Sequence, residues 1–437
     1  MDDTADASTS RRMVRVILAL GIVTGIVHTV QLARLEPAQI GLATDVYYYA
    51  ATQALAGGDF YVTAPPGHPG YYFMYAPVVV LSFIPFAILG DPTYAYALWT
   101  AVNLLTVCAL GIVMIRAIET AGVALTPLDR LLVFGYAGGS AGAASTILQG
   151  QVNLQLTLAI AAGVLFVERG REAPGGIALG IAAFVKLFPA LVGAWLLRRR
   201  AWRAILAATG VGLGLGLTGL AVFGPDTTTT WLTVTLSREA SVGTFAAGPN
   251  PDSWLLTVRR QLSVLAPWIP AMWLLPASIV FLAPVVLAAY RTFDTYRSRL
   301  VGLQATLLAM LVVFPLEPFY LSLVIFPTVP LLYLIDREYV TTRRLFLVGA
   351  LVASVPVWLA TVERVTEAAP LSPEMVSTVL ALARGFFAFA LPQMYGVWLM
   401  LGACVLYQHR VSQHRLREHR APGEGQTDNR GPPAEDT

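Results

Sequence analysis

The segment Gly175–Leu197 reads GGIALGIAAFVKLFPALVGAWLL and is apolar along its whole length except for Lys186 near the middle. Lys186 is also the only lysine among the 29 lysine and arginine residues of the chain. An ammonium group at membrane depth is unfavourable unless it pairs with another group or faces a polar cavity. The usual partner of such a compact cation is a phosphate or a carboxylate. The alternative is a lysine whose side chain extends to a nearby lipid headgroup. The apolar residues on both sides of Lys186 would make this distance long.

The composition of the whole chain agrees with a membrane location for this segment. Hydrophobic residues make up 56% of the chain, charged residues 13%, and the mean hydropathy is +0.65. A soluble domain carries about 25% charged residues, so we expect an all-α polytopic membrane protein. The net charge of +3 comes mostly from arginine clusters between apolar runs. Such clusters indicate the membrane topology rather than nucleic-acid binding. Cys108 and Cys404 lie in apolar runs and predict neither a disulfide framework nor a metal site.

Apolar runs long enough to span a bilayer recur along the chain. They fall at 13–32, 76–89, 92–115, 131–148, 152–167, 175–197, 204–223, 268–290, 300–316, 319–335, 345–360 and 379–407. Two long polar and aromatic segments, 33–75 and 224–267, interrupt them. We therefore expect a cytoplasmic tail over residues 1–12, an integral membrane domain over 13–408, and a cytoplasmic, disordered tail over 409–437.

Two topologies fit the arginine positions. With a cytoplasmic N-terminus and simple crossings, most arginine clusters fall inside and both long loops fall outside. That model leaves four arginines outside, against the charge rule: Arg116, Arg130, Arg169 and Arg171. In the alternative, residues 76–89 and 175–197 are non-crossing or re-entrant, which brings these arginines inside and moves Lys186 toward the outer face. The sequence leaves both topologies open, and both keep the two long loops on the outer side.

The first outer loop holds the best candidate for a catalytic carboxylate. Residues Gly41–Tyr61 read GLATDVYYYAATQALAGGDFY, in which Val46–Leu55 has a helical composition and Gly57–Gly58 predicts its end. Asp45 then lies near the N-terminus of a short helix at the membrane surface, where it could act as general base on an acceptor hydroxyl. The alternative is that Asp45 only caps this helix. Asp59 is a weaker candidate because aspartate is common in turns.

Further candidates come from the same loop and from a polar interruption downstream. His68 could serve as an acid, as a base or as a hydrogen-bond donor to a phosphate. The alternative is an incidental loop histidine. Tyr75 either anchors the membrane interface or stacks on a sugar. Gln149, Gln151 and Asn153 place three amides within an apolar region, where they could hold sugar hydroxyls or hydrogen-bond neighbouring helices.

The second outer loop and one short turn supply the remaining charged candidates. Arg259 and Arg260 form an arginine pair suited to phosphate, or else to anionic headgroups. Glu317 is either a turn residue or an acid within a pocket. The chain contains no Asp-x-Asp, no Walker A sequence and no dinucleotide-binding glycine motif in context. We therefore expect neither a metal nor a cofactor.

Three segments together resemble glycosyltransferase family 87. Residues 45–51 (DVYYYAA), with 57–61 (GGDFY) and 75–77 (YAP), resemble its first-loop signature. Residues 150–153 (GQVN) and 180–189 (GIAAFVKLFP) resemble its central block. Residues 250–253 (NPDS) resemble a second-loop Asn-Gln-Ser element, although Pro251 and Asp252 stand in place of the glutamine.

This resemblance implies a GT-C type bundle of about 10–12 transmembrane helices with two long outer loops that carry short interfacial helices. It implies an inverting, metal-independent transfer of a hexose, mannose in this family, from a polyprenyl (dolichyl) phosphate to a lipid-linked glycan or glycolipid. The reaction is expected on the extracytoplasmic face of the cell membrane. By the resemblance, Asp45 is the catalytic carboxylate, and Lys186 and Gln151 lie in the donor region. A flippase for lipid-linked sugars is the alternative.

Overall fold

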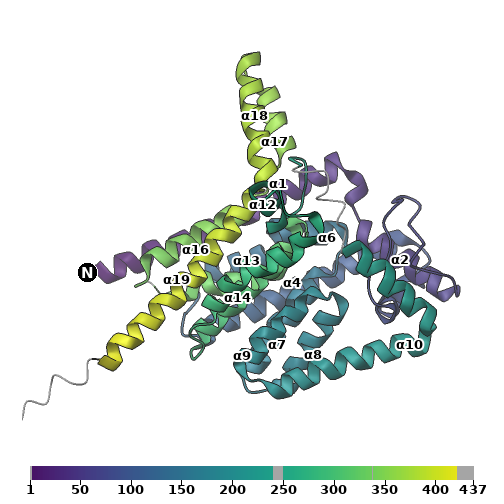
Figure 1. The fold of residues 1–437 in the computed structure, drawn as a ribbon, viewed down its shortest axis with the longest axis horizontal. Helices are drawn as coiled ribbons and strands as arrows, with labels where there is room; N and C mark the ends of the chain where they lie inside the picture. The colour runs from purple at the N-terminus through teal and green to yellow at the C-terminus, as the bar shows by residue number, and fades with distance from the viewer. Residues whose placement is uncertain (1, 240–249, 337, 421–437) are drawn as a thin grey trace, which may run out of the picture.

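The computed structural model describes residues 2–239, 250–336 and 338–420. Across these ranges the chain forms α-helices and short 3₁₀ helices, and the one pairing of extended backbone is an isolated bridge between Leu256 and Leu316. Figure 1 shows the helices packed as one elongated bundle, with the N-terminus at one end and α2 near the other. The expectation of an all-α polytopic membrane protein is confirmed.

The described elements follow one another along the chain. They are α1 (Asp2–Leu35), η1 (Pro37–Gln39), α2 (Leu42–Leu55), η2 (Pro77–Phe83), α3 (Ile84–Ala87), α4 (Pro92–Thr120), α5 (Pro127–Gly139), α6 (Ala141–Gln149), α7 (Asn153–Glu168), α8 (Glu172–Val185), η3 (Phe188–Leu191), α9 (Val192–Arg199), α10 (Trp202–Glu239), α12 (Val258–Leu265), η4 (Ala271–Trp273), α13 (Leu274–Ala289), α14 (Tyr296–Val313), η5 (Pro318–Val324), α15 (Ile325–Leu334), α16 (Val340–Ala353), α17 (Leu359–Ala368), α18 (Pro373–Phe389) and α19 (Pro392–Arg420). Most of the described elements are joined by short connections, whereas a longer segment, residues 56–76, joins α2 to η2.

Fewer uninterrupted spans occur than the apolar runs predict. Within the described ranges, four helices are long and apolar enough to cross a bilayer, and six if two bent helix pairs each count as one span. The remaining expected runs are shorter or broken helices, such as α7 and α8. Prolines and glycines interrupt helical hydrogen bonding, and neighbouring helices can satisfy the freed backbone groups at membrane depth.

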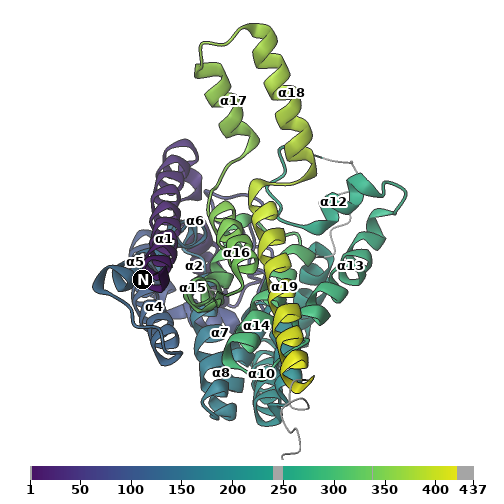
Figure 2. The ribbon, with the colours of Figure 1, turned by 90° about the vertical axis from the view of Figure 1, so that its left-hand side faces the viewer.

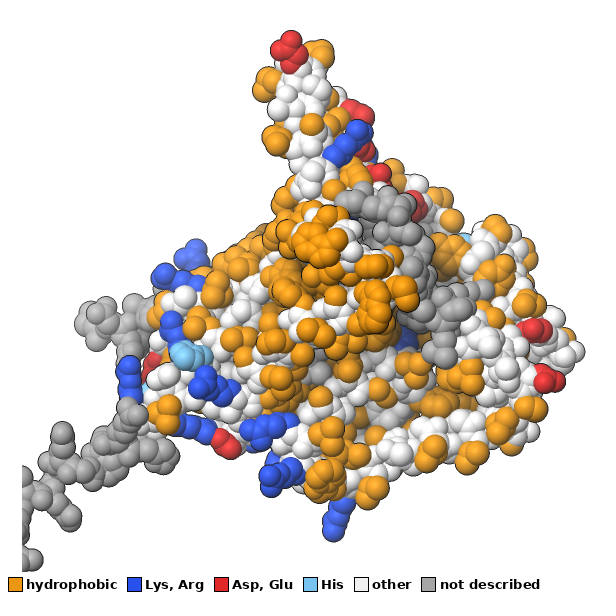
Figure 3. All heavy atoms as spheres, viewed as in Figure 1, with side chains coloured by type: hydrophobic (Ala, Val, Ile, Leu, Met, Phe, Trp, Pro, Cys, Tyr) orange, Lys and Arg blue, Asp and Glu red, His pale blue; other side chains and the backbone are white. Residues whose placement is uncertain are grey.

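One end of the bundle is rich in arginine and is called the basic end below. There Arg15 pairs with Asp129 at 2.8 Å, Arg130 pairs with Glu119 at 2.7 Å, and Arg299 pairs with Glu168 at 2.5 Å. Figure 3 shows lysine and arginine side chains gathered mostly toward the end that carries the N-terminus, with hydrophobic side chains across the middle. An arginine-rich end is typical of the cytoplasmic side of a membrane protein.

The segment that contains Lys186 enters and leaves the bundle at the same end. Arg171, just before α8, and Arg203, just after α9, line one shared pocket, and Arg203 N donates to Glu172 at 3.0 Å. The helix breaks at Lys186, whose backbone is extended (φ −132°, ψ 125°), and Pro189 follows within η3. Residues 175–197 therefore form a hairpin with Lys186 at its turn, which is the shape that the second of the two topologies expects. Arg169 accordingly lines a pocket with Arg299 at the basic end.

Close helix packing holds this hairpin in place. A Cβ atom at Gly176 of α8 would lie 2.1 Å from the backbone oxygen of Ala204 in α10. Only glycine permits the two backbones to approach this far, as at other small-residue interfaces in membranes. The glycines of the GGIALG sequence therefore position α8, and with it Lys186, against α10.

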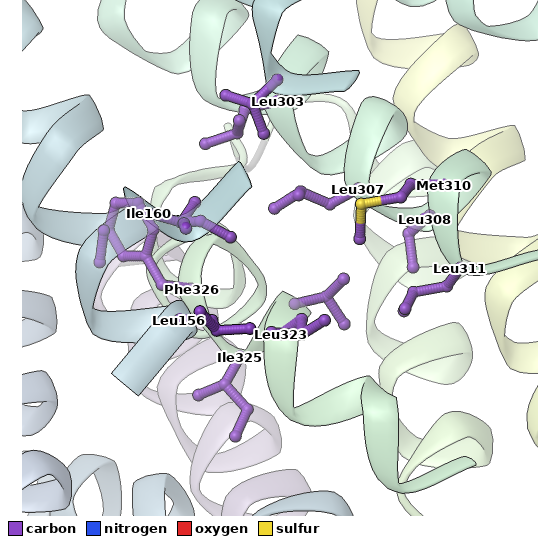
Figure 4. Close-up of a cluster of buried hydrophobic side chains, with 14 of the residues drawn as sticks. Leu156, Ile160, Leu303, Leu307, Leu308, Met310, Leu311, Leu323, Ile325 and Phe326 are labelled. Carbon is purple, nitrogen blue, oxygen red and sulfur yellow. The ribbon is translucent and has the colours of Figure 1, made fainter. Parts of the chain in front are cut away.

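The core of the bundle lies around α14, whose residues from Leu300 to Val313 are all buried. Figure 4 shows how side chains of α14 meet those of α7, η5 and α15 in one apolar cluster. The labelled members are Leu156, Ile160, Leu303, Leu307, Leu308, Met310, Leu311, Leu323, Ile325 and Phe326. Since this packing encloses α14 on all sides, the elements that flank it are fixed relative to one another.

Two expected boundaries are wrong. The segment 224–267 does not begin as a loop, because α10 continues past a kink at Gly224 to Glu239, and residues 240–249 lie outside the described ranges. The apolar run 379–407 is not one straight span, because α18 and α19 meet at a bend of 48° before Pro392. Figure 2 shows α17 and α18 projecting from the bundle as a hairpin. Helix α19 continues through residues 409–420, and the rest of the expected tail lies outside the described residues.

Candidate functional site

Asp45 lies in the first turn of α2, the short helix expected in the first outer loop. The helix ends at Leu55, just before Gly57–Gly58, as its sequence predicts. Gly41, with φ 71°, is the N-cap residue, and no side chain caps this helix, so Asp45 does not serve as the cap. The Asp45 carboxylate instead faces His68, whose Nε2 lies 3.3 Å from Oδ2 of Asp45. The two candidates of the first loop are thus brought together.

Two features of its environment shift the pKa of Asp45 in opposite directions. Partial burial raises the pKa of Asp45 above its ordinary value, and the charge and hydrogen bond of His68 oppose part of this rise. The side chain remains 27% exposed, which leaves the carboxylate accessible to a substrate. A carboxylate whose pKa is raised is a stronger base than an ordinary one, which suits it to accept a proton from a hydroxyl.

Lys186 is buried, with 7% of its surface exposed, and its ammonium group contacts polar groups and aromatic rings and interacts electrostatically with Glu317. Nζ donates to Oδ1 of Asn153 at 2.7 Å and to the hydroxyl of Tyr320 at 3.0 Å. It also lies 4.2 Å from the centre of the Tyr320 ring and 5.8 Å from that of Tyr75. These contacts orient the ammonium and support its charge by cation–π attraction. The snorkelling alternative therefore does not describe this lysine.

Lys186 faces a cavity of ≈ 570 Å³, called the lysine cavity below. Its polar lining comes from Lys186, Gln151 and the hydroxyls of Tyr47, Tyr75 and Tyr320. Its apolar lining includes Phe184, Leu187, Phe188, Leu191 and Trp231. A polar end with one cation beside a larger apolar surface suits a ligand that carries both a charged group and a hydrocarbon chain.

Helix α2 connects Asp45 to the lysine cavity. Leu42 and Val46, on either side of Asp45 in the sequence, line this cavity, although Asp45 itself does not. Tyr71 lines it as well, and its ring lies 6.3 Å from that of His68 in an edge-on arrangement. The Asp45–His68 pair is therefore next to the cavity that holds Lys186.

The three amides Gln149, Gln151 and Asn153 have different hydrogen-bond partners. Gln151 accepts from Tyr47 at 3.1 Å, and Tyr47 and Tyr75 share a hydroxyl contact of 2.9 Å in the lysine cavity. Asn153 binds Lys186, as described above, whereas Gln149 donates to Gln39 at 3.0 Å. The expected grouping of these amides around one ligand is thus divided between two sides of the turn at Gly150.

Gly150 makes this turn possible. Its φ of 69° lies in the left-handed region, and a Cβ at this position would lie 1.8 Å from Oγ1 of Thr44. Thr44 belongs to α2 and sits next to Asp45. The absence of a side chain at Gly150 therefore lets the amide segment pack directly against the helix that carries the carboxylate.

A second cavity, of ≈ 260 Å³, lies beside the first and is called the glutamate cavity below. It contains the expected candidates Glu317 and Gln149, and Tyr71 lines both cavities. Its other polar and aromatic lining residues are His28, Glu36, Gln39, Tyr136, Ser140, Ser145, Trp254, Ser354, Trp358 and Gln393. Glu317 is thus a pocket acid, and it does not share the lysine cavity with Lys186.

The structure does not bring Arg259 and Arg260 to either cavity. Arg259 donates to the backbone oxygen of Val313 at 3.1 Å. Arg260 donates to the backbone oxygens of Asn250 at 2.7 Å and Ser253 at 2.9 Å, and also to the C-terminal turn of α18. Burial lowers the pKa of Arg260 to about 10. This contact set ties α12 to the second loop and to α18.

Several lining residues were not predicted from the sequence. Tyr47 and Tyr320 resemble ordinary interfacial tyrosines in the sequence, and only their contacts with Gln151 and Lys186 distinguish them. Gln393 carried a usable signal, because it is an amide within the apolar run 379–407. In the described parts of the chain, no three acidic, histidine or cysteine side chains come together as a metal site.

Comparison with known proteins agrees with the geometry. The model of glycosyltransferase family 87 matches residues 73–315, which is more than half of the 437 residues. The matched range includes Lys186, the amide segment and the second loop, while Asp45 and His68 precede it. A comparison with curated proteins found no match.

Proposed function

The chain belongs to glycosyltransferase family 87 and is a membrane glycosyltransferase, and from this premise we propose its donor, acceptor and mechanism. The donor is a polyprenyl (dolichyl) phosphate that carries a hexose, which we propose to be mannose. The acceptor is a lipid-linked glycan or a glycolipid. The sugar passes from one to the other in a single inverting displacement that requires no metal.

The observation that carries this proposal is the position of Lys186 at a helix turn, facing a mostly apolar cavity next to the Asp45 helix. A polyprenyl phosphate has one anionic group joined to a long hydrocarbon chain. The ammonium of Lys186 offers a charge-assisted contact to the phosphate, and the apolar lining near Trp231 and Leu191 offers a surface for the first isoprene units. A water-soluble nucleotide sugar would leave this apolar surface unused.

Asp45 is the proposed general base. The acceptor hydroxyl attacks C1 of the donor sugar, and its proton passes to the Asp45 carboxylate. The new bond joins the acceptor oxygen to C1, while the bond between C1 and the phosphate oxygen breaks. The electron pair of that bond leaves with the polyprenyl phosphate, which is a stable anion, so the step needs no general acid. His68 holds the carboxylate in place through its contact at 3.3 Å.

Lys186 is proposed to stabilise the negative charge that develops on the leaving phosphate. A fixed cation in a site with little water lowers the energy of such a transition state without reorganising. Asn153 and Tyr320 keep the ammonium in position before the donor binds. Since Arg259 and Arg260 line neither cavity and donate to backbone oxygens, the proposal assigns the phosphate contact to Lys186 alone.

The reaction is proposed to take place at the extracytoplasmic face of the cell membrane. The turn at Lys186 points away from the basic end, where the flanking residues Arg171 and Arg203 lie. Asp45 and His68 belong to the first long loop, which both topologies put outside. Under the charge rule, this arrangement supports a position of the two cavities toward the outer leaflet.

The donor class is tested with purified full-length protein in lipid nanodiscs. Polyprenyl-phosphate mannose and a nucleotide-linked mannose, each radiolabelled in the sugar, are supplied separately with a lipid-extracted acceptor mixture. We expect label in the acceptor and release of polyprenyl phosphate only from the first donor. Label transfer from the nucleotide sugar alone would contradict the proposal. In sealed proteoliposomes, movement of intact polyprenyl-phosphate mannose between leaflets, without bond cleavage, would identify a flippase instead.

A further inference from the structure

The glutamate cavity is not used by the donor chemistry, and its lining is more polar than that of the lysine cavity. It lies between the end of α1, helix α6, η5 and the start of α19. Its only shared lining residue with the lysine cavity is Tyr71, whose ring is the edge-on neighbour of His68. The two cavities therefore approach each other beside the Asp45–His68 pair.

Several buried polar atoms on this lining have no hydrogen-bond partner among the described residues. They are Oγ of Ser140, Nε1 of Trp358, and both Nε2 and Oε1 of Gln393. Gln393 is 1% exposed and Ser140 is 5% exposed. Buried amides and hydroxyls are nearly always hydrogen-bonded, so a set of donors and acceptors that share one cavity indicates a ligand rich in hydroxyl groups.

The acidic side chains Glu36 and Glu317 both line the cavity, and neither lysine nor arginine is among its described lining residues. Lys186 lies outside this lining, although its charge acts on Glu317. The lysine cavity differs, because there the ammonium itself lines the space and can contact a phosphate. Carboxyl groups offer a phosphate no positive charge, whereas sugar hydroxyls can donate to them.

Aromatic rings complete a surface suited to a sugar. The rings of Trp254 and Trp358 lie 5.6 Å apart, and His28 stacks on Trp358 at 4.5 Å. Flat rings give a polyol an apolar surface for its C–H groups, while the neighbouring amides and carboxylates bind its hydroxyls.

We propose that the glutamate cavity binds the acceptor, and that this acceptor ends in a neutral polyhydroxylated sugar rather than in a phosphorylated one. The assignment of the site to an acceptor rests on the proposed function. Glu36 and Glu317 select against a phosphate near the accepting hydroxyl, and Gln393, Ser140 and Trp358 bind the sugar hydroxyls. The accepting hydroxyl passes Tyr71 to reach Asp45.

The test measures binding to each cavity separately, with full-length protein in nanodiscs. The probes are methyl α-mannobioside, the same disaccharide with a 6-phosphate, and polyprenyl phosphate. For Gln393→Leu, which keeps the volume of the side chain, we expect binding of the neutral disaccharide to weaken at least tenfold while polyprenyl phosphate binds as in the wild type. For Lys186→Met we expect polyprenyl phosphate to bind more weakly while the neutral disaccharide binds as in the wild type. Retained polyprenyl phosphate binding by Gln393→Leu shows that this variant is folded.

A separate variant tests whether the glutamate cavity discriminates between neutral and phosphorylated sugars. The wild-type protein is expected to bind the phosphorylated disaccharide at least tenfold more weakly than the neutral one, and Glu317→Gln to reduce this difference. Equal binding of the two disaccharides, unchanged neutral binding in Gln393→Leu, or a cavity that binds no disaccharide and so holds only water, would each overturn the inference. Failure of the proposed function is a separate result, in which both ligands bind as expected and no sugar is transferred.

Discussion

The Nε2 atom of His68 lies 3.3 Å from Oδ2 of Asp45. This contact joins the first turn of α2 to the loop that follows it, and it places an imidazole against a carboxylate whose pKa is raised by burial. Tyr71, three residues after His68, reaches both cavities. The predictions below follow from this arrangement and from the turn at Lys186.

Asp45→Asn is expected to lower the rate of sugar transfer by about 10²–10⁴-fold, because the amide cannot accept the proton of the acceptor hydroxyl. Donor binding should persist, since Lys186 and the apolar lining are untouched. Transfer is followed with radiolabelled polyprenyl-phosphate mannose. Asp59→Asn is the matched control: Asp59 accepts a turn hydrogen bond from Tyr61 N at 2.8 Å, and asparagine can do the same. Equal rates for the two variants would remove Asp45 from the role of base.

Lys186→Met is expected to weaken the affinity for polyprenyl phosphate by about ten- to a hundredfold, which corresponds to the loss of a hydrogen bond to a charged group. The methionine keeps much of the length of the side chain without its charge. Affinity is measured by titration of the protein in nanodiscs. Arg203→Met removes an exposed cation at the basic end and serves as control, with no change expected. Similar affinity losses in both variants would indicate a general charge effect.

The acid limb of the pH–rate profile should report Asp45. Only the ionised carboxylate accepts a proton, so kcat/KM should fall as the pH drops through the pKa of Asp45, which burial holds above its ordinary value. His68 lowers this pKa, and its removal in His68→Ala should raise it further. The acid limb of His68→Ala should therefore move to higher pH. A limb that stays in place, or moves to lower pH, would show that another group controls it.

Tyr71→Phe is the control for that profile. It retains the ring that lies 6.3 Å from the ring of His68 and removes only the phenolic hydroxyl. The limb is expected to remain where it is in the wild type, even if the rate itself changes.

Gly150→Ala is expected to destabilise the protein by about 1–2 kcal/mol through its left-handed backbone alone, with a further cost from the contact with Thr44. The new Cβ would lie 1.8 Å from Oγ1 of Thr44. The shift forced on α2 should also slow transfer. Gly212→Ala, in open space along α10, is the control and should leave the thermal unfolding temperature unchanged or higher. The expectation fails if the two variants unfold alike.

The re-entrant topology is tested with single cysteines in a chain where Cys108 and Cys404 are replaced by alanine. Cysteines at Arg171 and Trp202 should react with a membrane-impermeant thiol reagent from the same side, because both residues line one pocket. A cysteine at Val62, in the first long loop, should react from the opposite side. Labelling of positions 171 and 202 from different sides would mean that residues 175–197 cross the membrane.

The sequence allowed the prediction of the parts of the site that depend on local pattern. A lone lysine in an apolar run predicted a special environment for Lys186, and a helical stretch ended by Gly57–Gly58 predicted the helix of Asp45. The charge rule offered the re-entrant segment as one of two topologies. The bundle as a whole followed from hydropathy.

The remaining features depend on tertiary contacts that no local pattern records. Arg259 and Arg260 looked like phosphate ligands, but the fold offers their guanidinium groups backbone oxygens left over at the end of α14, in the second loop and at the end of α18. Ser140, Trp358 and Gln393 lie far apart in the sequence and come together only in the fold, where the end of α5 and the starts of α17 and α19 border one cavity. The lining of the glutamate cavity could therefore not be predicted from the sequence alone.

The most direct test is a structure of the Asp45→Asn protein bound to polyprenyl-phosphate mannose in nanodiscs, determined by electron microscopy. We expect the phosphate within hydrogen-bonding distance of Lys186 Nζ, the first isoprene units along the apolar lining near Trp231, and C1 of the sugar turned toward residue 45. A donor bound with its phosphate away from Lys186, or with its sugar out of reach of residue 45, would contradict the account.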